Sequence, residues 1–121
     1  MAYEKLKNKW NKFRADEAEL AKLRKDLLLI KGVPVLKEYG VTRAILFGSL
    51  STGRCKQNSD IDLFVNPLSA ENFWKLSRDL EDALNLSVDL YSDSDDSTFV
   101  QKIITRGVVI YDISKDGSEM H

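Results

Sequence analysis

Two short apolar runs flank a glycine–serine pair and two aspartates in the middle of this 121-residue chain. The run 44–47 leads into the pair Gly48–Ser49, and Asp60 and Asp62 open a second run that continues to Val65. Each run has the length and composition of a short buried strand. The pattern therefore predicts a strand, a turn of small residues, a loop, and a second strand that carries two carboxylates.

The spacing of Asp60 and Asp62 suggests a function for the second strand. Successive side chains on a strand alternate between its faces, so both carboxylates project from the same side. Like charges held this close raise each other's pKa unless a cation lies between them, and Mg²⁺ prefers oxygen ligands. A surface role, in which charges on an edge strand deter aggregation, is the competing interpretation. A turn that can hold a phosphate beside a metal-binding pair favours phosphoryl or nucleotidyl transfer.

This pattern, Gly48–Ser49 and then Asp60-Ile61-Asp62 after ten intervening residues, resembles the signature of the DNA polymerase beta-like nucleotidyltransferase superfamily. Within it, the chain is most similar to the minimal nucleotidyltransferase (MNT) family of HEPN/MNT toxin–antitoxin type, from about residue 35 to residue 111. The resemblance implies an α/β (α+β) fold: a small mixed sheet flanked by helices, with an N-terminal helical extension.

The resemblance assigns three carboxylates to catalysis and metal binding: Asp60, Asp62 and Asp89. Asp89 is expected on a neighbouring strand, as the family's third carboxylate is, and to share a face with Ser87 and Tyr91. A third oxygen ligand completes a metal site and can accept or orient the proton of an attacking hydroxyl. The implied cofactor is Mg²⁺, with two ions expected and Mn²⁺ as the alternative.

The residues expected to bind the nucleotide are Gly48, Ser49 and Arg54. If a helix begins just after Gly48, its free N–H groups and its dipole favour a phosphate there, and Ser49 adds a hydroxyl. The family commonly has an arginine just before the next glycine, a place that Thr52 occupies in this chain. Either Arg54 or Lys56 takes over that phosphate contact, or the nucleotide is held more weakly.

By resemblance, the expected reaction is a metal-dependent transfer of a nucleoside monophosphate to an acceptor hydroxyl. The group transferred is AMP when ATP is the donor, or the corresponding monophosphate from another NTP. The expected acceptor is a HEPN-type toxin that this chain AMPylates as the antitoxin, and a homo-oligomer is compatible with the pattern. The alternative, favoured by Thr52 and the small size, is a non-catalytic subunit that uses the same fold to bind nucleotide or a partner.

The charge balance argues against one class of protein. Eighteen basic and nineteen acidic residues give a net charge of −1, whereas strong nucleic-acid binding by the chain alone needs a basic excess. Residues 1–39 hold ten basic and six acidic residues (+4), and 40–121 hold eight and thirteen (−5). A solvated helix beside an acidic core explains this split better than an RNA-binding arm. A single cysteine, Cys55, and no long apolar segment predict a cytoplasmic protein without a membrane span.

One nucleotidyltransferase domain is expected over 1–121, with an N-terminal helical segment (1–39), a catalytic core (40–113) and a polar tail (114–121). Apolar spacing of three and four predicts helix over 3–31, either as one long helix that changes what it contacts or as two packed helices. Its two apolar stripes are Tyr3, Leu6, Trp10 and Phe13, and then Leu20, Leu23, Leu27 and Ile30.

Further boundaries follow from turn and cap residues. The segment Gly32-Val33-Pro34 is expected to break the first helix, and Pro34 to open a short helix that stops at Gly40. Later helices are expected at 69–84, with Ser69 as N-cap, and at 96–106. The expected strands are 43–47, 59–65, 87–92 and 108–111.

Overall fold

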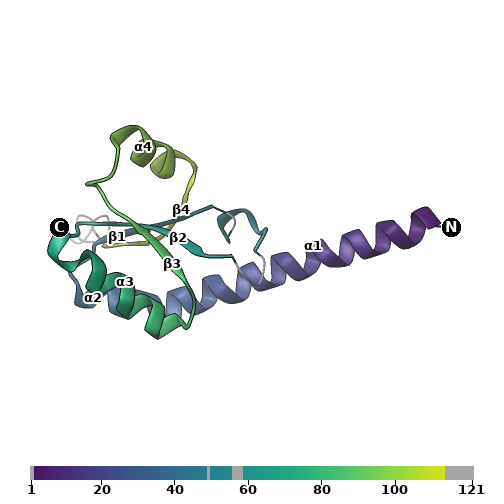
Figure 1. The fold of residues 1–121 in the computed structure, drawn as a ribbon, viewed down its shortest axis with the longest axis horizontal. Coiled ribbons are helices and arrows are strands. Elements are labelled where there is room, and N and C mark those ends of the chain that lie inside the picture. The colour runs from purple at the N-terminus through teal and green to yellow at the C-terminus, as the bar shows by residue number, and fades with distance from the viewer. Residues whose placement is uncertain (1, 49, 56–58, 114–121) are drawn as a thin grey trace.

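The computed structural model describes residues 2–48, 50–55 and 59–113, with side chains from residue 15 onward (Figure 1). Within these residues, one mixed sheet holds four strands in the order β3-β2-β1-β4. They are β1 (Arg43–Phe47), β2 (Ile61–Asn66), β3 (Val88–Tyr91) and β4 (Val108–Asp112). β1 runs antiparallel to β2 and β4, and β2 runs parallel to β3. The expected small mixed sheet flanked by helices is confirmed.

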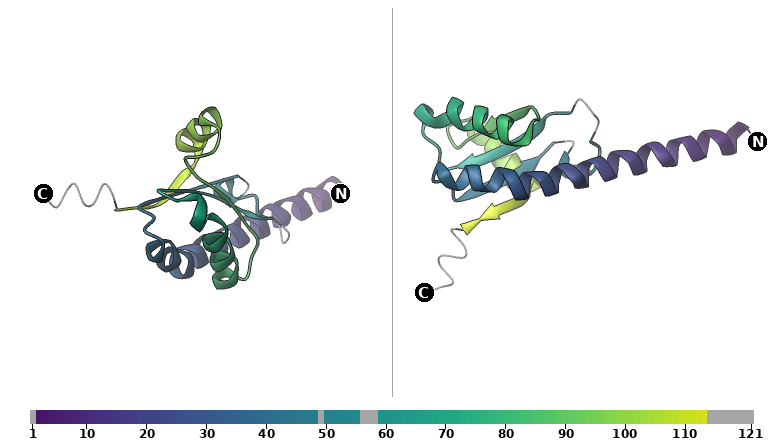
Figure 2. Two further views of the ribbon diagram at one scale, coloured as in Figure 1. Left: turned by 60° about the vertical axis from the view of Figure 1, so that its left-hand side comes forward. Right: turned by 90° about the horizontal axis from the view of Figure 1, so that it is seen from below.

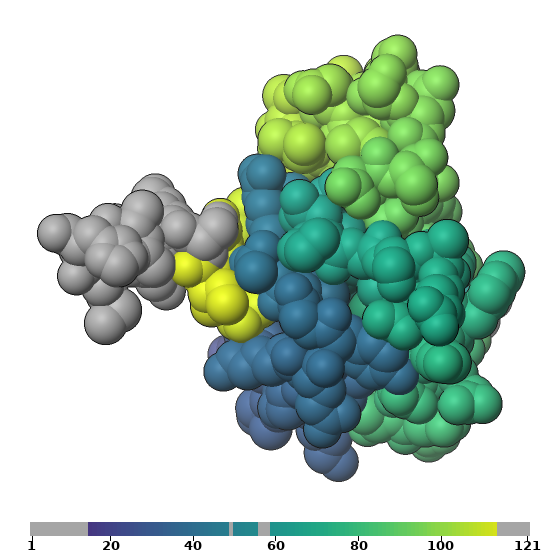
Figure 3. Space-filling model, turned by 90° about the vertical axis from the view of Figure 1, so that its left-hand side faces the viewer, coloured from purple at the N-terminus to yellow at the C-terminus, as the bar shows by residue number. Residues whose placement is uncertain are grey.

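Helices cover the two faces of this sheet unequally (Figures 1 and 2). One face is covered by α1 (Ala2–Leu27), η1 (Leu28–Gly32), α2 (Val33–Glu38) and α3 (Ala70–Leu84). The opposite face carries α4 (Ser97–Arg106), which forms a separate lobe at the top of Figure 3. We call this second side of the sheet the α4 face.

Side-chain alternation along β2 divides the hydrophobic core between the two faces. Ile61, Leu63 and Val65 are buried against the layer of α1, α2 and α3. Phe64 points the other way and packs with Ile45 and with Ile103 of α4. Because side chains two apart on a strand share a face, Asp62 lies on the α4 face beside Phe64.

The first helix does not break at Gly32-Val33-Pro34, so that expectation was wrong. Leu27, Gly32 and Val33 all have right-handed helical dihedrals, and η1 is a π-helical turn that joins α1 to α2. The N–H of Val33 bonds the carbonyl of Leu28, five residues back. This wider turn accommodates Pro34, which has no N–H and would clash with a carbonyl in a regular α-helix. A Cβ at Gly32 would lie 2.7 Å from Leu28 Cδ1, so a larger residue there would require the Leu28 side chain to shift.

Only two of the four residues of the second apolar stripe pack against the core. Leu23 and Ile30 are 59% and 71% exposed, while Ala21, Arg24 and Leu28 are buried. Leu20 and Leu27 border the core, so the buried face is centred about one residue beyond the predicted one. Residues 2–14 are helical and extend beyond the sheet (Figure 1), and the stripe of Tyr3, Leu6, Trp10 and Phe13 lies outside the described side chains.

The other expected elements agree with the structure to within two residues. The Ser69 hydroxyl caps α3 by accepting from the Asn72 N–H at 3.3 Å. Asp96 caps α4 by accepting from the N–H groups of Thr98 and Phe99. Gly40 ends the α2 segment with a φ of +75°. None of the described helices combines the length and apolar character needed to cross a membrane.

Candidate active site

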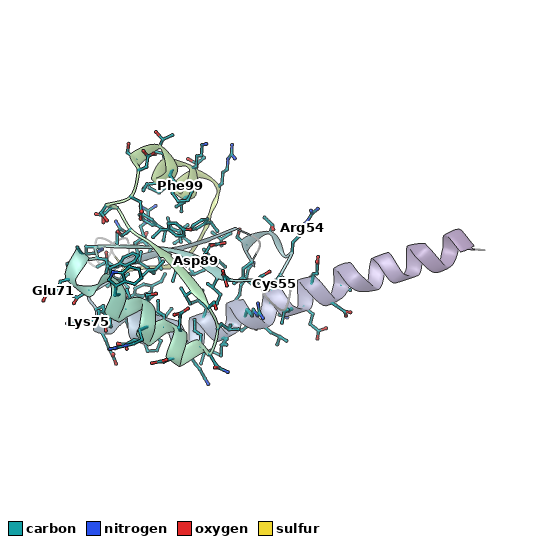
Figure 4. All side chains as sticks on the ribbon, in the orientation of Figure 1. Arg54, Cys55, Glu71, Lys75, Asp89 and Phe99 are labelled. Atoms are coloured by element: carbon teal, nitrogen blue, oxygen red, sulfur yellow. The ribbon has the colours of Figure 1, made fainter. Side chains whose placement is uncertain are left out.

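The three predicted carboxylates come together at one end of β2 and β3. Asp62 lies beside Asp89 in the parallel pairing of these strands and opposite Phe47 of β1. Asp60 directly precedes β2 and, like Asp89, is exposed, whereas Asp62 is half-buried. Figure 4 places Asp89 on the sheet below Phe99 of α4. The acidic cluster Asp60/Asp62/Asp89 therefore occupies an open part of the α4 face.

Electrostatics in this cluster disfavour a negative charge on Asp62. Burial, then the charges of Asp89 and Asp60, and a hydrogen bond with Asp89 raise the pKa of Asp62 from 3.8 to about 6. Burial and the neighbouring charges of Asp62 and Asp89 also raise the pKa of Tyr91. A cation placed among the carboxylates would relieve this repulsion.

The donor set fits a hard divalent ion. The acidic cluster supplies oxygen ligands, which Mg²⁺ and Mn²⁺ accept. Among the described residues, no three His, Cys, Asp or Glu side chains are already arranged to hold an ion. Binding would therefore require the side chains of the acidic cluster to rearrange around the ion.

The pKa of Asp62 predicts how the stability of metal-free protein depends on pH. The folded-state pKa of about 6 exceeds the ordinary value of 3.8. The stabilising contribution of Asp62 to the free energy of unfolding is therefore complete at low pH and is lost as pH rises through 6. In the presence of a chelator, we expect wild type to melt at a lower temperature than Asp62→Asn at pH 8. This gap in melting temperature should be smaller at pH 5. Added Mg²⁺ should narrow the gap at pH 8, and a gap that does not change with pH would contradict this assignment.

The turn after β1 lies directly against the acidic cluster. Gly48 has a φ of +75°, and a Cβ at this position would lie 3.1 Å from Asp62 Cγ and overlap Asp62 Oδ2. The Ser51 hydroxyl donates to the Gly48 carbonyl at 2.7 Å. The helix expected after Gly48 is only the single 3-10 turn η2 (Leu50–Thr52), so its dipole is smaller than that of a full helix. Ser49 and Lys56 lie outside the described residues.

A pocket of about 330 Å³ adjoins this turn on the α4 face. The turn contributes Gly48, Ser51 and Thr52, and α4 contributes Phe99, Lys102 and Arg106. Arg54 is absent from the lining, and its exposed side chain extends outward from the loop, away from Asp89 (Figure 4). Of the residues predicted to bind the nucleotide, the structure thus places Gly48 at the pocket and Arg54 outside it.

Arg24 is a residue of the site region that the sequence reasoning did not identify. Its guanidinium is buried under the loop that precedes β2, where Nη1 donates to the Ser59 carbonyl at 3.1 Å and to Cys55 Sγ at 3.2 Å. This contact ties the loop leading to Asp60 to α1, and Cys55 is itself buried in the core. The available signal was a basic residue four positions after Leu20 and three before Leu27, on the helix face that both leucines share.

Replacing Arg24 should destabilise the protein and loosen the loop before Asp60. We expect Arg24→Met to reduce the free energy of unfolding by about 1–3 kcal/mol, because the Ser59 carbonyl loses a charged donor. Methionine preserves much of the apolar stem. Urea unfolding measures the cost, with Lys22→Met on the exposed side of α1 as control. An equal cost in the two variants would show that the hydrogen bonds contribute little.

Comparison with known proteins identifies the family. The family model described as "Polymerase beta, Nucleotidyltransferase" matches residues 31–116. The chain belongs to this nucleotidyltransferase family. A relative of this nucleotidyltransferase from Methanocaldococcus jannaschii, provisionally named a protein adenylyltransferase, is 36% identical over 63 residues, which cover 50% of this chain and 68% of the relative.

Solved structures place the nucleotidyltransferase among the minimal members of the superfamily. One similar chain belongs to a toxin–antitoxin complex with AMP-PNP; the TM-score is 0.62, with 31% identity over 73% of this chain and 76% of that chain. Another belongs to the Shewanella oneidensis complex of a tri-AMPylated HEPN toxin with an MNT antitoxin, at TM-score 0.56 and 26% identity, covering 81% and 77%. These similarities confirm the polymerase beta-like fold and the HEPN/MNT resemblance.

Proposed function

We propose that this nucleotidyltransferase transfers AMP from ATP to a hydroxyl group of a HEPN-type toxin and so acts as its antitoxin. The observation that carries the proposal is the contact between the Gly48 turn and Asp62, which lies beside Asp89 on an open face. A triphosphate held at the turn would have its α-phosphate next to the carboxylates. The similar complexes that contain AMP-PNP and an AMPylated toxin support adenylyl transfer to protein.

In the proposed reaction, the acceptor oxygen attacks the α-phosphorus, and the bond from that phosphorus to the β-phosphate oxygen breaks to release pyrophosphate. Asp60, Asp62 and Asp89 would hold Mg²⁺ or Mn²⁺, in two ions, and the bound metal would neutralise charge on nucleophile and leaving group. Asp89, which is exposed toward the open face, would accept the proton of the acceptor hydroxyl. Ser49 would donate its hydroxyl to a phosphate oxygen.

The open position of the acidic cluster supports a macromolecular acceptor. Asp60 and Asp89 are exposed, so the described residues build walls on the turn side and α4 side of the site but leave the carboxylates uncovered. A small acceptor needs walls on several sides to be positioned for in-line attack. A segment of a toxin, brought by a protein–protein contact outside the site, would supply its own orientation. We place the reaction in the cytoplasm, where ATP and Mg²⁺ are both present.

A non-catalytic binding subunit is the second candidate. It is favoured by Arg54, which extends away from the pocket, and by Thr52 in the position where the family commonly has arginine. Calorimetry with ATP and Mg²⁺ together with a pyrophosphate-release assay distinguishes the two candidates. Binding of ATP without pyrophosphate release in the presence of the toxin would favour the subunit.

Co-expression with a HEPN-type toxin from the neighbouring reading frame tests the proposed function. Intact mass spectrometry should detect one or more added AMP units on the toxin. The addition should be lost with the Asp60→Asn/Asp62→Asn double variant and preserved with Asp82→Asn, an exposed carboxylate on α3. An unmodified toxin in a stable complex with wild-type protein would overturn adenylyl transfer.

A further inference from the structure

Two cations on α4 line the pocket beside the Gly48 turn. Lys102 and Arg106 are four residues apart, so both lie on the helix face that also brings Phe99 to the pocket. Both side chains are exposed, and neither forms an ion pair with another described residue. Positive charge on α4 therefore faces a turn whose other side contacts the acidic cluster through Asp62.

This arrangement of charge selects a particular kind of ligand. A metal would hold one end of the ligand at the acidic cluster, and the rest would pass Gly48 toward Lys102 and Arg106. A polyanionic tail fits the space between the Gly48 turn and the two cations, because cations and the N–H groups of a backbone turn both bind anions. A second pocket lies between Ser69, Trp74 and Asp95. It lacks this charge, because none of its described lining residues is a lysine or an arginine.

We infer that Lys102 and Arg106 bind the β- and γ-phosphates of the nucleotide and stabilise pyrophosphate as it leaves. The inference rests on the proposed function and deepens it. When the bond between the α-phosphorus and the bridging oxygen breaks, negative charge accumulates on the departing pyrophosphate. The two cations would stabilise that charge. Thr52 lines the same pocket as a neutral residue, so α4 supplies the positive charge from a different element.

The structural alternative is a role at the end of the helix. Arg106 lies in the last turn of α4, where a cation interacts favourably with the free carbonyl groups. That role would alter stability and leave the choice between nucleotides unchanged. The test must therefore compare ligands that differ only in the β- and γ-phosphates.

Calorimetric titration with ATP and with AMP, at fixed Mg²⁺, makes this comparison. Lys102→Ala and Arg106→Ala should each weaken ATP binding about tenfold, because each removes a charge-assisted hydrogen bond. AMP binding should remain unchanged in both variants, and Arg106→Lys should retain most ATP affinity. The control is Lys75→Ala, an exposed cation on α3 on the opposite face of the sheet (Figure 4).

Each outcome of the titrations decides the inference. Unchanged ATP affinity, or an equal loss for ATP and AMP, overturns it. Weaker toxin binding with normal ATP binding would assign the two cations to the partner and also overturns it. If ATP selectivity depends on Lys102 and Arg106 but the toxin is never modified, the inference stands and adenylyl transfer fails. If the toxin is modified equally by wild type and both variants, the proposed function stands alone.

Discussion

Asp60→Asn/Asp62→Asn is expected to reduce nucleotidyl transfer by at least about a thousandfold and to leave the fold intact. The proposed metal ions contribute several kcal/mol of transition-state stabilisation, and their binding depends on these carboxylates. The metal-free double variant should melt at a higher temperature than wild type at neutral pH. Burial and the charge of Asp89 disfavour ionised Asp62, and asparagine removes that cost.

Toxin modification measured by mass spectrometry gives the rate, and circular dichroism with thermal melting gives the fold and stability. Asp82→Asn serves as the matched control, because it removes an exposed charge from α3 on the other side of the sheet. Near-native turnover in the double variant would refute a mechanism that depends on metal held by the acidic cluster. A lower melting temperature would show that these carboxylates stabilise the fold.

Gly48→Val is expected to abolish transfer and to destabilise the protein by more than the backbone conformation alone explains. A φ of +75° costs a residue with a side chain roughly 1–2 kcal/mol. Valine at this position would in addition overlap the Asp62 carboxylate, so either Asp62 or the turn must move. The same substitution would therefore disturb nucleotide binding and the acidic cluster together.

Gly53 offers a control for the backbone term. It has the same φ of +75°, and apart from its two chain neighbours no atom of the described residues would lie within 4 Å of a Cβ there. The difference in unfolding free energy between Gly48→Val and Gly53→Val therefore isolates the collision with Asp62. In an Asp62→Ala background this difference should shrink, because the carboxylate has been removed. Equal costs at both glycines in the wild-type background would show that the turn accommodates a side chain without moving Asp62.

Local sequence rules were sufficient to predict the strands of the sheet and the helices α3 and α4 that connect them. The run 44–47 has the length and composition of a short buried strand, and Ser69 and Asp96 have the short oxygen side chains that cap helices. The alternation of Asp60, Asp62 and Phe64 also fixes which face of β2 carries charge. These features depend on neighbouring residues in the sequence, so they are readable without the fold.

The errors arose where tertiary packing determines the outcome. A proline two residues after a glycine ordinarily ends a helix, but the π turn η1 shifts the hydrogen bonding by one residue and lets the helix continue. Apolar spacing favoured Leu23 over Arg24 as a buried residue. Spacing carries no information about the Ser59 carbonyl, which accepts a hydrogen bond from the buried Arg24 guanidinium. The proximity of α4 to the Gly48 turn could likewise not be predicted from the sequence, since about fifty residues separate them.

The contact between Gly48 and Asp62 also has a thermodynamic consequence. The proposed nucleotide turn and a proposed metal ligand share one boundary, so a change in the position of either alters the space available to the other. Binding free energies coupled in this way are reciprocal: the factor by which metal raises the affinity for nucleotide equals the factor by which nucleotide raises the affinity for metal. Metal titrations with and without ATP should therefore give the same factor as ATP titrations with and without metal.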